Sequence, residues 1–277
     1  MSVLLIHPRP AAPTRRGRPL PPRVTVITTV HNRERYVEAA VRSVRTQTFR
    51  DFEHVIVDDA STDASLSILR RLAAEDQRIR LIESRRLGVV GALALAHKHA
   101  SARLIGWVDS DDLLVQTALE ETVGALDANP DAGLVFTDHI TIDEAGRPLP
   151  DPPRPALAFH AHQLITDFFA FHFRLFRRSV FDAAGGIDES LTAAPDYDFC
   201  LRASEHCRFL HLPVPLYCYR RHGSAISTTR RAEQTSNSLL AAERALARRG
   251  LADRLRIAVD HNGRFSLVSR TNPQGPS

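Results

Sequence analysis

Apolar runs alternate with helical patterns along the chain from residue 23 to about residue 140. Runs rich in β-branched and other apolar residues predict five buried strands, at 24–30, 54–59, 80–83, 103–109 and 133–138. Between these runs apolar residues recur at helical spacing, as they do at Tyr36, Val37, Ala40, Val41 and Val44. Strands that alternate with helices of this length form a mainly parallel sheet, joined by right-handed crossovers and covered on both faces. This part of the chain is therefore predicted to be a Rossmann-like α/β domain.

The alternation loosens after residue 140. Gly146 indicates a hairpin, and the pattern then predicts a helix near 159–169, a strand near 172–176 and a helix that begins at Asp196. The C-terminal part predicts a long helix at 232–249. A β-hairpin should follow, because alternating apolar residues flank Asn262-Gly263, which is a strong type I′ turn signal.

The composition is that of an ordinary soluble globular protein, with 43% hydrophobic and 25% charged residues among 277. No apolar run approaches the roughly 18 residues that a membrane span needs, and the N-terminal apolar stretch is shorter than the roughly 7 to 15 residues of a signal-peptide core. These features predict a cytoplasmic protein. Cys200, Cys207 and Cys218 form no CxxC pair, so they are expected to be reduced thiols.

The formal charge of +4 comes largely from arginines in the N-terminal tail and in segment 230–256. We expect no nucleic-acid partner, because a solvated arginine-rich surface explains such a charge most simply. The C-terminal helix leaves open a peripheral contact with the inner face of the membrane, through an apolar face formed by Leu239, Leu240, Leu246 and Leu251. The same pattern fits a helix that packs on the core, which is the commoner case.

Polar and acidic clusters follow three of the predicted strands. The first strand ends in TTVHNRE, the second in VDDASTD and the fourth in WVDSDD. Ligands of open parallel sheets bind at the carboxyl ends of strands, so these clusters are expected to meet at one edge. Asp109 and Asp111, spaced as D-x-D, suit Mg²⁺ or Mn²⁺, which prefer carboxylate and phosphate oxygens. The alternative is that these carboxylates only cap helices and complement their dipoles; Ser61 is expected to cap the second helix.

The segments 24–63 and 106–112 resemble the N-terminal half of the family 2 glycosyltransferases, which have the GT-A fold. The resemblance continues through GGIDESL, PDYDFCLR and PLYCYRRHGSAIS, and so covers about 24–227. It implies inverting, metal-assisted transfer of a sugar from a nucleotide-sugar, with UDP more strongly indicated than GDP or dTDP. The acceptor is an unidentified glycan, lipid-linked molecule, small molecule or protein.

Composition, pattern and resemblance together predict a division of the chain. Residues 1–22, rich in proline and arginine and without apolar periodicity, are expected to form a flexible leader. Residues 23–228 form the GT-A domain, of which 23–140 is the nucleotide-sugar-binding half and 141–228 the acceptor and catalytic half. Residues 229–277 are an appendix of one helix and one hairpin.

Donor and metal contacts carry over to particular residues. By resemblance, Thr29, Asp58 and Asp59 contact the nucleoside. Asp109 and Asp111 bind the ribose and the metal-diphosphate, with Asp112 adjacent in support.

Residues of the second half carry over as well. His222 is expected to complete the metal shell, and Arg220 can bind the diphosphate or be solvated. Asp196 is the expected general base, because it falls where inverting members have their catalytic carboxylate. Asp198, two residues on, would instead form an i,i+4 ion pair with Arg202.

Two departures from the family pattern are visible. Pro195 replaces the glutamate of the usual Glu-Asp pair and fits the first turn of a helix. Leu93 and Ala94 stand where the family often has an asparagine or arginine, and Arg85 or Arg86 could substitute.

Two further functions remain open on the sequence. A nucleotidyltransferase would use a similar sheet and metal, but TTVHNRERY lacks the glycine-rich phosphate loop of that class. A noncatalytic nucleotide- or carbohydrate-binding protein would keep the fold without turnover. The phenylalanines could line an acceptor pocket but are more often core; this cluster comprises Phe168, Phe169, Phe171, Phe173 and Phe176.

Overall fold

The predicted alternation of strands and helices is present in the computed structural model, which describes residues 5–6, 21–150, 161–170, 172–223 and 229–270. The strands are β1 (Leu5–Ile6), β2 (Val24–Val30), β3 (Phe52–Asp59), β4 (Ile79–Ser84), β5 (Leu104–Trp107), β6 (Leu113–Leu114), β7 (Ala132–Ile142), β8 (Arg174–Arg177), β9 (Arg208–Arg220), β10 (Leu255–Val259) and β11 (Phe265–Ser269). The helices are α1 (Val37–Arg45), α2 (Ser65–Glu75), α3 (Gly88–His99), α4 (Ala118–Ala128), α5 (Arg178–Ala183), α6 (Pro195–Ala203) and α8 (Arg231–Arg248), with a 3-10 turn η1 (Gln163–Ile165).

One sheet runs through the molecule in the order β1-β4-β3-β2-β5-β8-β7-β9-β6. Strands β4, β3, β2 and β5 are parallel, as predicted, so their carboxyl ends share one edge. Strand β8 runs antiparallel between β5 and β7, and β7 is parallel to β9. The predicted α/β class is confirmed.

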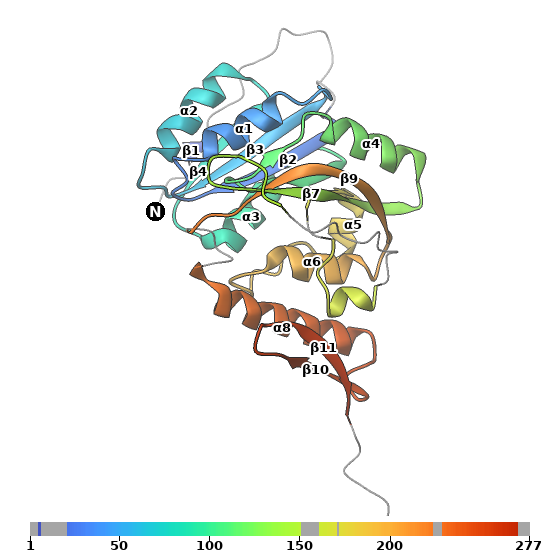
Figure 1. The fold of residues 1–277 in the computed structure, drawn as a ribbon. Helices are drawn as coiled ribbons and strands as arrows, with labels where there is room; N and C mark the ends of the chain where they lie inside the picture. Colours follow the sequence, from blue (N-terminus) through green and yellow to red (C-terminus); the bar gives the residue numbers. More distant parts are fainter. Residues whose placement is uncertain (1–4, 7–20, 151–160, 171, 224–228, 271–277) are drawn as a thin grey trace, which may run out of the picture.

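Helices cover both faces of the sheet. Helices α1, α2 and α4 lie on one face, and α3, α5 and α6 lie on the other (Figure 1). The apolar spacing explains this arrangement, because α1 turns Val37, Ala40, Val41 and Val44 toward the sheet and buries all four. The two layers enclose separate clusters of buried residues on the two faces.

Several details of the sequence prediction need correction. Within 161–169 the structure has only the 3-10 turn η1, whereas a helix was predicted. Strand β6 was not predicted, and neither was β9, which contains Pro213 and Pro215. β9 accommodates these prolines because its pairing with β7 shifts register there, so the ladder does not need their missing N–H groups. The expected cap Ser61 lies outside α2; the Asp63 carboxylate accepts a hydrogen bond from the Ser65 N–H instead.

Other expectations on the core are confirmed. Phe169, Phe173 and Phe176 are buried, whereas Phe171 lies outside the described residues. The cysteines are free thiols, as predicted. In the N-terminal segment the described residues Leu5–Ile6 pair antiparallel with β4.

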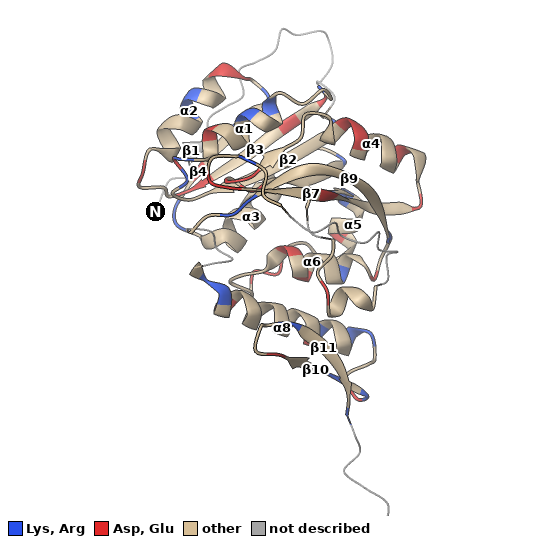
Figure 2. Cartoon of the chain, viewed as in Figure 1, with Lys and Arg blue, Asp and Glu red and all other residues tan. Residues whose placement is uncertain are grey.

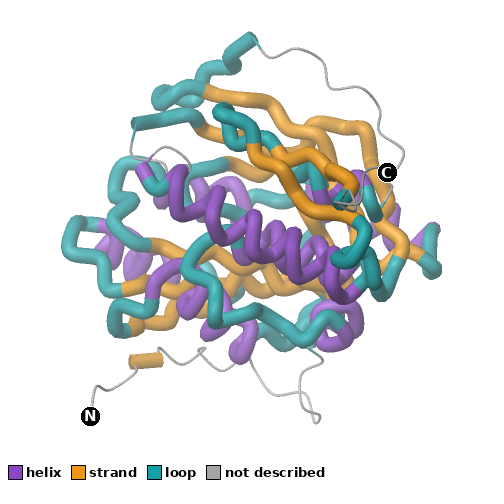
Figure 3. Tube along the Cα trace, turned by 90° about the horizontal axis from the view of Figure 1, so that it is seen from below, coloured by secondary structure: helices purple, strands orange, loops and turns teal. Residues whose placement is uncertain are grey.

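The C-terminal helix α8 lies against α6, and the β10–β11 hairpin lies against α8 (Figures 1 and 3). Arginines occur toward both ends of α8, and charges of both signs lie on α1 and α2 (Figure 2). None of the helices in the described part of the chain combines the length and apolar character that crossing a membrane requires.

Core packing accounts for the apolar residues of α8. Leu246 is buried, and Leu239 and Leu251 pack partly buried against the core, whereas Leu240 is 39% exposed. We expect Leu246→Ala to lower the free energy of unfolding by about 2–4 kcal/mol because it leaves a cavity. Leu240→Ala, the matched control, should change it by less than about 0.5 kcal/mol. Equal effects of the two substitutions in urea unfolding would contradict this packing.

Two buried histidines should make the folded protein less stable in acid. Burial lowers the pKa of His54 and of His97 to about 3. An unfolded histidine has a pKa of about 6.5, so below that pH the unfolded state binds more protons and the free energy of unfolding falls toward pH 3. Each histidine should contribute a loss of about 1.4 kcal/mol per pH unit within this window.

The measurement is urea unfolding between pH 7.5 and 4.5. Fluorescence of Trp107 suits it, because the indole N–H donates to His97 Nε2 at 3.0 Å. His54→Gln should flatten the pH dependence by one proton relative to the wild type. An unchanged slope would show that His54 does not carry this effect.

Candidate active site

A cleft opens where β2 and β5 end, opposite the start of α6. Thr29 from β2, the residues Asp109 to Asp111 after β5, and Asp196 from α6 all line it. An adjoining hollow, which we call the β3 hollow, shares Thr29 and Arg33 with the cleft and continues to Asp59 and Arg86. The three polar strand ends therefore converge at one edge, as the sequence predicted.

Asp109 and Asp111 both line the cleft. The Asp109 side chain is 59% solvent-accessible, and its N–H donates to the Tyr217 hydroxyl at 3.0 Å. Asp111 Oδ2 lies 3.1 Å from Arg33 Nε and 3.0 Å from His222 Nε2. Although solvent reaches Asp109, the surrounding protein desolvates its carboxylate, and Asp111 and Asp196 repel its negative charge. Both effects raise the pKa of Asp109. This excess of negative charge favours a bound cation.

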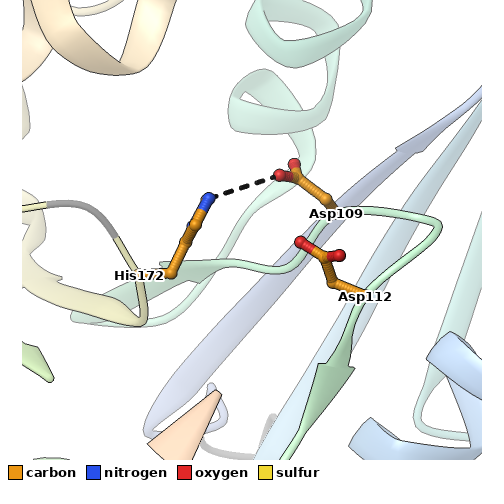
Figure 4. Close-up of side chains that lie close together, drawn as sticks. All are labelled: Asp109, Asp112 and His172. Carbon is orange, nitrogen blue, oxygen red and sulfur yellow. Dashed lines mark ion pairs between the residues drawn. The ribbon is translucent and has the colours of Figure 1, made fainter. Parts of the chain in front are cut away.

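His172 and Asp112 also lie beside Asp109 (Figure 4). The sequence did not predict the position of His172. His172 Nε2 is 3.7 Å from Asp109 Oδ2, and the His172 ring stacks on Tyr217 with the ring centroids 4.6 Å apart. One potential ligand atom from each of Asp109, Asp112 and His172 lies within 4.8 Å of the other two. The sequence carried no signal for His172, because it precedes a strand inserted from the second half of the chain.

The chemistry of this cluster fits a hard divalent cation. Asp112 is buried; its Oδ1 accepts a hydrogen bond from the Arg220 N–H at 2.7 Å, while Oδ2 has no hydrogen-bond partner among the described residues. Burial and the neighbouring charges of Asp109 and Asp111 raise the pKa of Asp112 well above its usual value. An orphaned buried oxygen beside two further carboxylates is an arrangement that Mg²⁺ or Mn²⁺ would relieve.

Asp196 also lines the cleft. Ala194 has a positive φ of 54°, and Pro195 starts α6, as predicted, so the first turn presents Asp196 to the cleft. Asp196 Oδ2 is 3.3 Å from the guanidinium of the buried Arg174. Arg174 therefore fixes the orientation of this carboxylate while leaving it accessible.

Asp198 has a different surrounding on the same helix. Its Oδ2 accepts a hydrogen bond from Arg202 Nε at 2.9 Å, and its side chain is buried. The predicted i,i+4 ion pair is confirmed. Of the two carboxylates, only Asp196 lines the cleft.

The two aspartates at the end of β3 differ in the same way. Asp59 lines the β3 hollow, where it accepts hydrogen bonds from Arg86 and from the N–H groups of Leu87 and Gly88 at the start of α3. Asp58 is buried, accepts a hydrogen bond from the Ser61 N–H and lines neither the cleft nor the β3 hollow. Of the predicted nucleoside contacts, Thr29 lines the cleft and the β3 hollow, Asp59 lines the hollow, and Asp58 lines neither.

Arg220 lines the cleft, and His222 lies next to Asp111. The Arg220 guanidinium is buried and donates to the backbone carbonyls of Asp111, Asp143 and Glu144, so the solvated alternative is wrong. His222 is also buried and contacts Asp111 directly. Arg33, which the sequence did not single out, is the arginine that lines both the cleft and the β3 hollow.

Comparison with known proteins relates this site to sugar transfer. Residues 25–185 match the model of "Glycosyl transferase family 2". The chain is 29% identical to chondroitin synthase of Escherichia coli over 83% of its own length, but it spans only 33% of that relative.

Solved structures show the same fold. With TarS 1-349 from S. aureus in complex with UDP-GlcNAc, the TM-score is 0.65 at 20% identity, covering 79% of this chain and 65% of that one. With the mannosyltransferase PcManGT of Pyrobaculum calidifontis, in complex with GDP-Man and Mn²⁺, the TM-score is 0.56 at 23% identity, covering 89% and 79%. These likenesses confirm the GT-A fold.

Proposed function

Because the chain belongs to glycosyl transferase family 2, we propose that this glycosyltransferase moves a sugar, with inversion, from a UDP-sugar to a hydroxyl of a saccharide acceptor. The observation that carries the proposal is that Asp109, Asp111 and Asp196 line one cleft. Nucleotide-sugars bound to TarS and PcManGT support the donor class. Likeness to a chondroitin synthase supports the saccharide acceptor.

A divalent cation is part of the proposal. Asp109 and Asp111 would hold it, and Asp112 and His172 offer further ligand atoms next to Asp109. When bound, Mg²⁺ or Mn²⁺ neutralises the diphosphate and so makes it a better leaving group. The PcManGT complex contains Mn²⁺, which supports the assignment.

The donor would lie along the shared wall of the cleft and the β3 hollow. Thr29 offers a hydroxyl and Asp59 a carboxylate to the nucleoside, by the donors and acceptors that these groups present. Arg33 and Arg86 line the same wall, and a guanidinium suits phosphate oxygens. Arg33 would share the diphosphate role expected of Arg220, which also lines the cleft but donates from Nε and one terminal nitrogen to backbone carbonyls.

Asp196 would act as the general base. Its carboxylate takes the proton of the acceptor hydroxyl while that oxygen attacks the anomeric carbon. The attack comes from the face opposite the leaving nucleoside diphosphate, so the carbon–oxygen bond to the diphosphate breaks as the new one forms and the configuration inverts. Arg174 holds the Asp196 carboxylate in place during this transfer.

The test is nucleotide release from a panel of UDP-, GDP- and dTDP-sugars, with Mn²⁺, with Mg²⁺ and with a chelator. We expect slow hydrolysis of one UDP-sugar, which depends on the cation and accelerates when a saccharide acceptor is added. Binding of a donor without release would favour the noncatalytic alternative. No release and no binding from any member of the panel would overturn the proposal.

A further inference from the structure

A second groove lies beyond Asp196, between α6, α8 and the β10–β11 turn. We call it the α8 groove. The lining residues that matter here are Phe168, Tyr197, Gln234, Ser238, Asn262 and Arg264. Phe265 of β11 closes the side formed by the hairpin. The groove is thus built from the catalytic half and from the C-terminal appendix together.

The α8 groove is continuous with the cleft. Gln234 of α8 lines both of them, and Tyr197 follows Asp196 directly on α6. The Phe168 ring lies 5.4 Å below the guanidinium of Arg174, the same group that holds Asp196. A molecule that places a hydroxyl at Asp196 can therefore extend into this groove.

The β3 hollow and the α8 groove share different residues with the cleft. The β3 hollow shares Thr29, Arg33 and Ser110, which belong to the wall assigned to the donor. The α8 groove shares Gln234 and touches none of those residues. The donor wall and the α8 groove therefore border different parts of the cleft, and Asp196 adjoins the groove through Tyr197.

The lining of the α8 groove has the character of a saccharide site. Phe168 and Phe265 supply aromatic rings, on which the apolar face of a sugar ring can pack. Gln234, Ser238 and Asn262 supply amides and a hydroxyl, which donate to and accept from sugar hydroxyls. The exposed Arg264 adds a guanidinium that forms no ion pair with any residue in the described ranges.

The groove is also preformed. Arg231 of α8 donates to the Asn262 carbonyl at 2.8 Å and so ties the hairpin turn to the helix. Gly263 has a positive φ of 79°, and its position brings the turn close to Thr235 of α8. A rigid site loses less entropy on binding than one that must first be ordered.

We propose that the α8 groove binds the sugar residues of an oligosaccharide acceptor next to the residue that is glycosylated. This inference rests on the proposed function, since it takes Asp196 as the point where the acceptor hydroxyl reacts. It gives the C-terminal appendix a role in acceptor selection, in addition to its packing on α6. The efficiency of transfer should therefore depend on acceptor length.

The experiment uses the full chain and two series of acceptors, each two to eight residues long. One series alternates hexuronic acid and N-acetylhexosamine, and the other is made of N-acetylglucosamine alone. Ser238→Trp fills the groove, and Ser236→Trp places the same side chain on an exposed position of the same helix. Nucleotide release without acceptor monitors the donor site in each variant.

We expect kcat/KM of the wild type and of Ser236→Trp to rise at least tenfold with length in one series. Ser238→Trp should lose that rise while keeping wild-type nucleotide release. If kcat/KM of Ser238→Trp rose with acceptor length as in the wild type, the inference would be overturned. It would also be overturned if kcat/KM of the wild type did not depend on acceptor length, or if the enzyme hydrolysed its donor but transferred no sugar to any of these acceptors. If no donor is hydrolysed or bound, the proposed function itself fails and the inference is withdrawn with it.

Discussion

Replacing Asp196 with asparagine is expected to slow glycosyl transfer by about 10²–10⁴-fold, the usual contribution of a general base, while donor affinity stays within about twofold. Asparagine keeps the size of the side chain but cannot take the acceptor proton. The carboxylate contacts Arg174 and does not belong to the cluster of Asp109, Asp112 and His172, so the donor site should be intact. Steady-state transfer rates and calorimetric donor titration measure the two quantities.

Asp198→Asn is the matched control on the same helix. Asp198 is buried in its ion pair with Arg202, so its replacement should lower the free energy of unfolding by about 3–5 kcal/mol. The folded protein that remains should transfer sugar at the wild-type rate. If Asp196→Asn kept transfer within a few-fold of the wild type, another group would have to take the proton.

The second large effect is expected from Asp109→Asn, which should weaken Mn²⁺ binding in the presence of UDP by at least about 100-fold. Loss of an outer partner of a metal site costs about 10–100-fold, and a direct ligand should cost more. Asp109 is the residue common to the D-x-D pair and to the cluster with Asp112 and His172. Replacing Asp109 therefore removes a ligand whether the cation is held by the D-x-D pair or by the cluster with Asp112 and His172.

Electron paramagnetic resonance of free Mn²⁺ measures this affinity. Asp131→Asn is the control, because Asp131 is an exposed carboxylate paired with Arg208 and lies outside the residues that line the cleft. It should leave Mn²⁺ binding unchanged. If the wild type and Asp109→Asn bound Mn²⁺ with equal affinity, Asp109 would not be a ligand of the cation.

The sequence predicted the parallel strands and the edge at which their polar ends meet. This prediction was possible because the carboxyl ends of parallel strands share an edge whatever the details of packing. Thr29, Asp59, Asp109 and Asp111 all line the cleft or its hollow for this reason. The part of the site made by the first half of the chain was therefore accessible from pattern alone.

The part made by the second half was not. His172 and Arg174 reach the cleft because β8 runs antiparallel into the sheet beside β5, and no local pattern announces that insertion. Two prolines hid β9, which carries Tyr217 and Arg220 behind the acidic cluster. These contacts depend on tertiary pairing between distant segments.

The type of a residue also did not show whether its side chain lines the site. Asp58 and Asp59 are neighbours at one strand end and both are buried, yet only Asp59 lines the hollow. Successive residues of a strand point to opposite faces, and the sequence does not show which face the ligand takes. The apolar face of α8 was ambiguous for a similar reason, since packing on a core and on a membrane call for the same spacing.

The cleft should bind a nucleotide-sugar together with a divalent cation. Calorimetric titration of the unmodified chain with UDP-sugars, in Mn²⁺ and in chelator, measures this binding. We expect one UDP-sugar to bind in Mn²⁺ and chelation to weaken this binding at least about tenfold, as expected when a cation links carboxylates to a diphosphate. Absence of binding by every UDP-, GDP- and dTDP-sugar in both conditions would contradict this expectation.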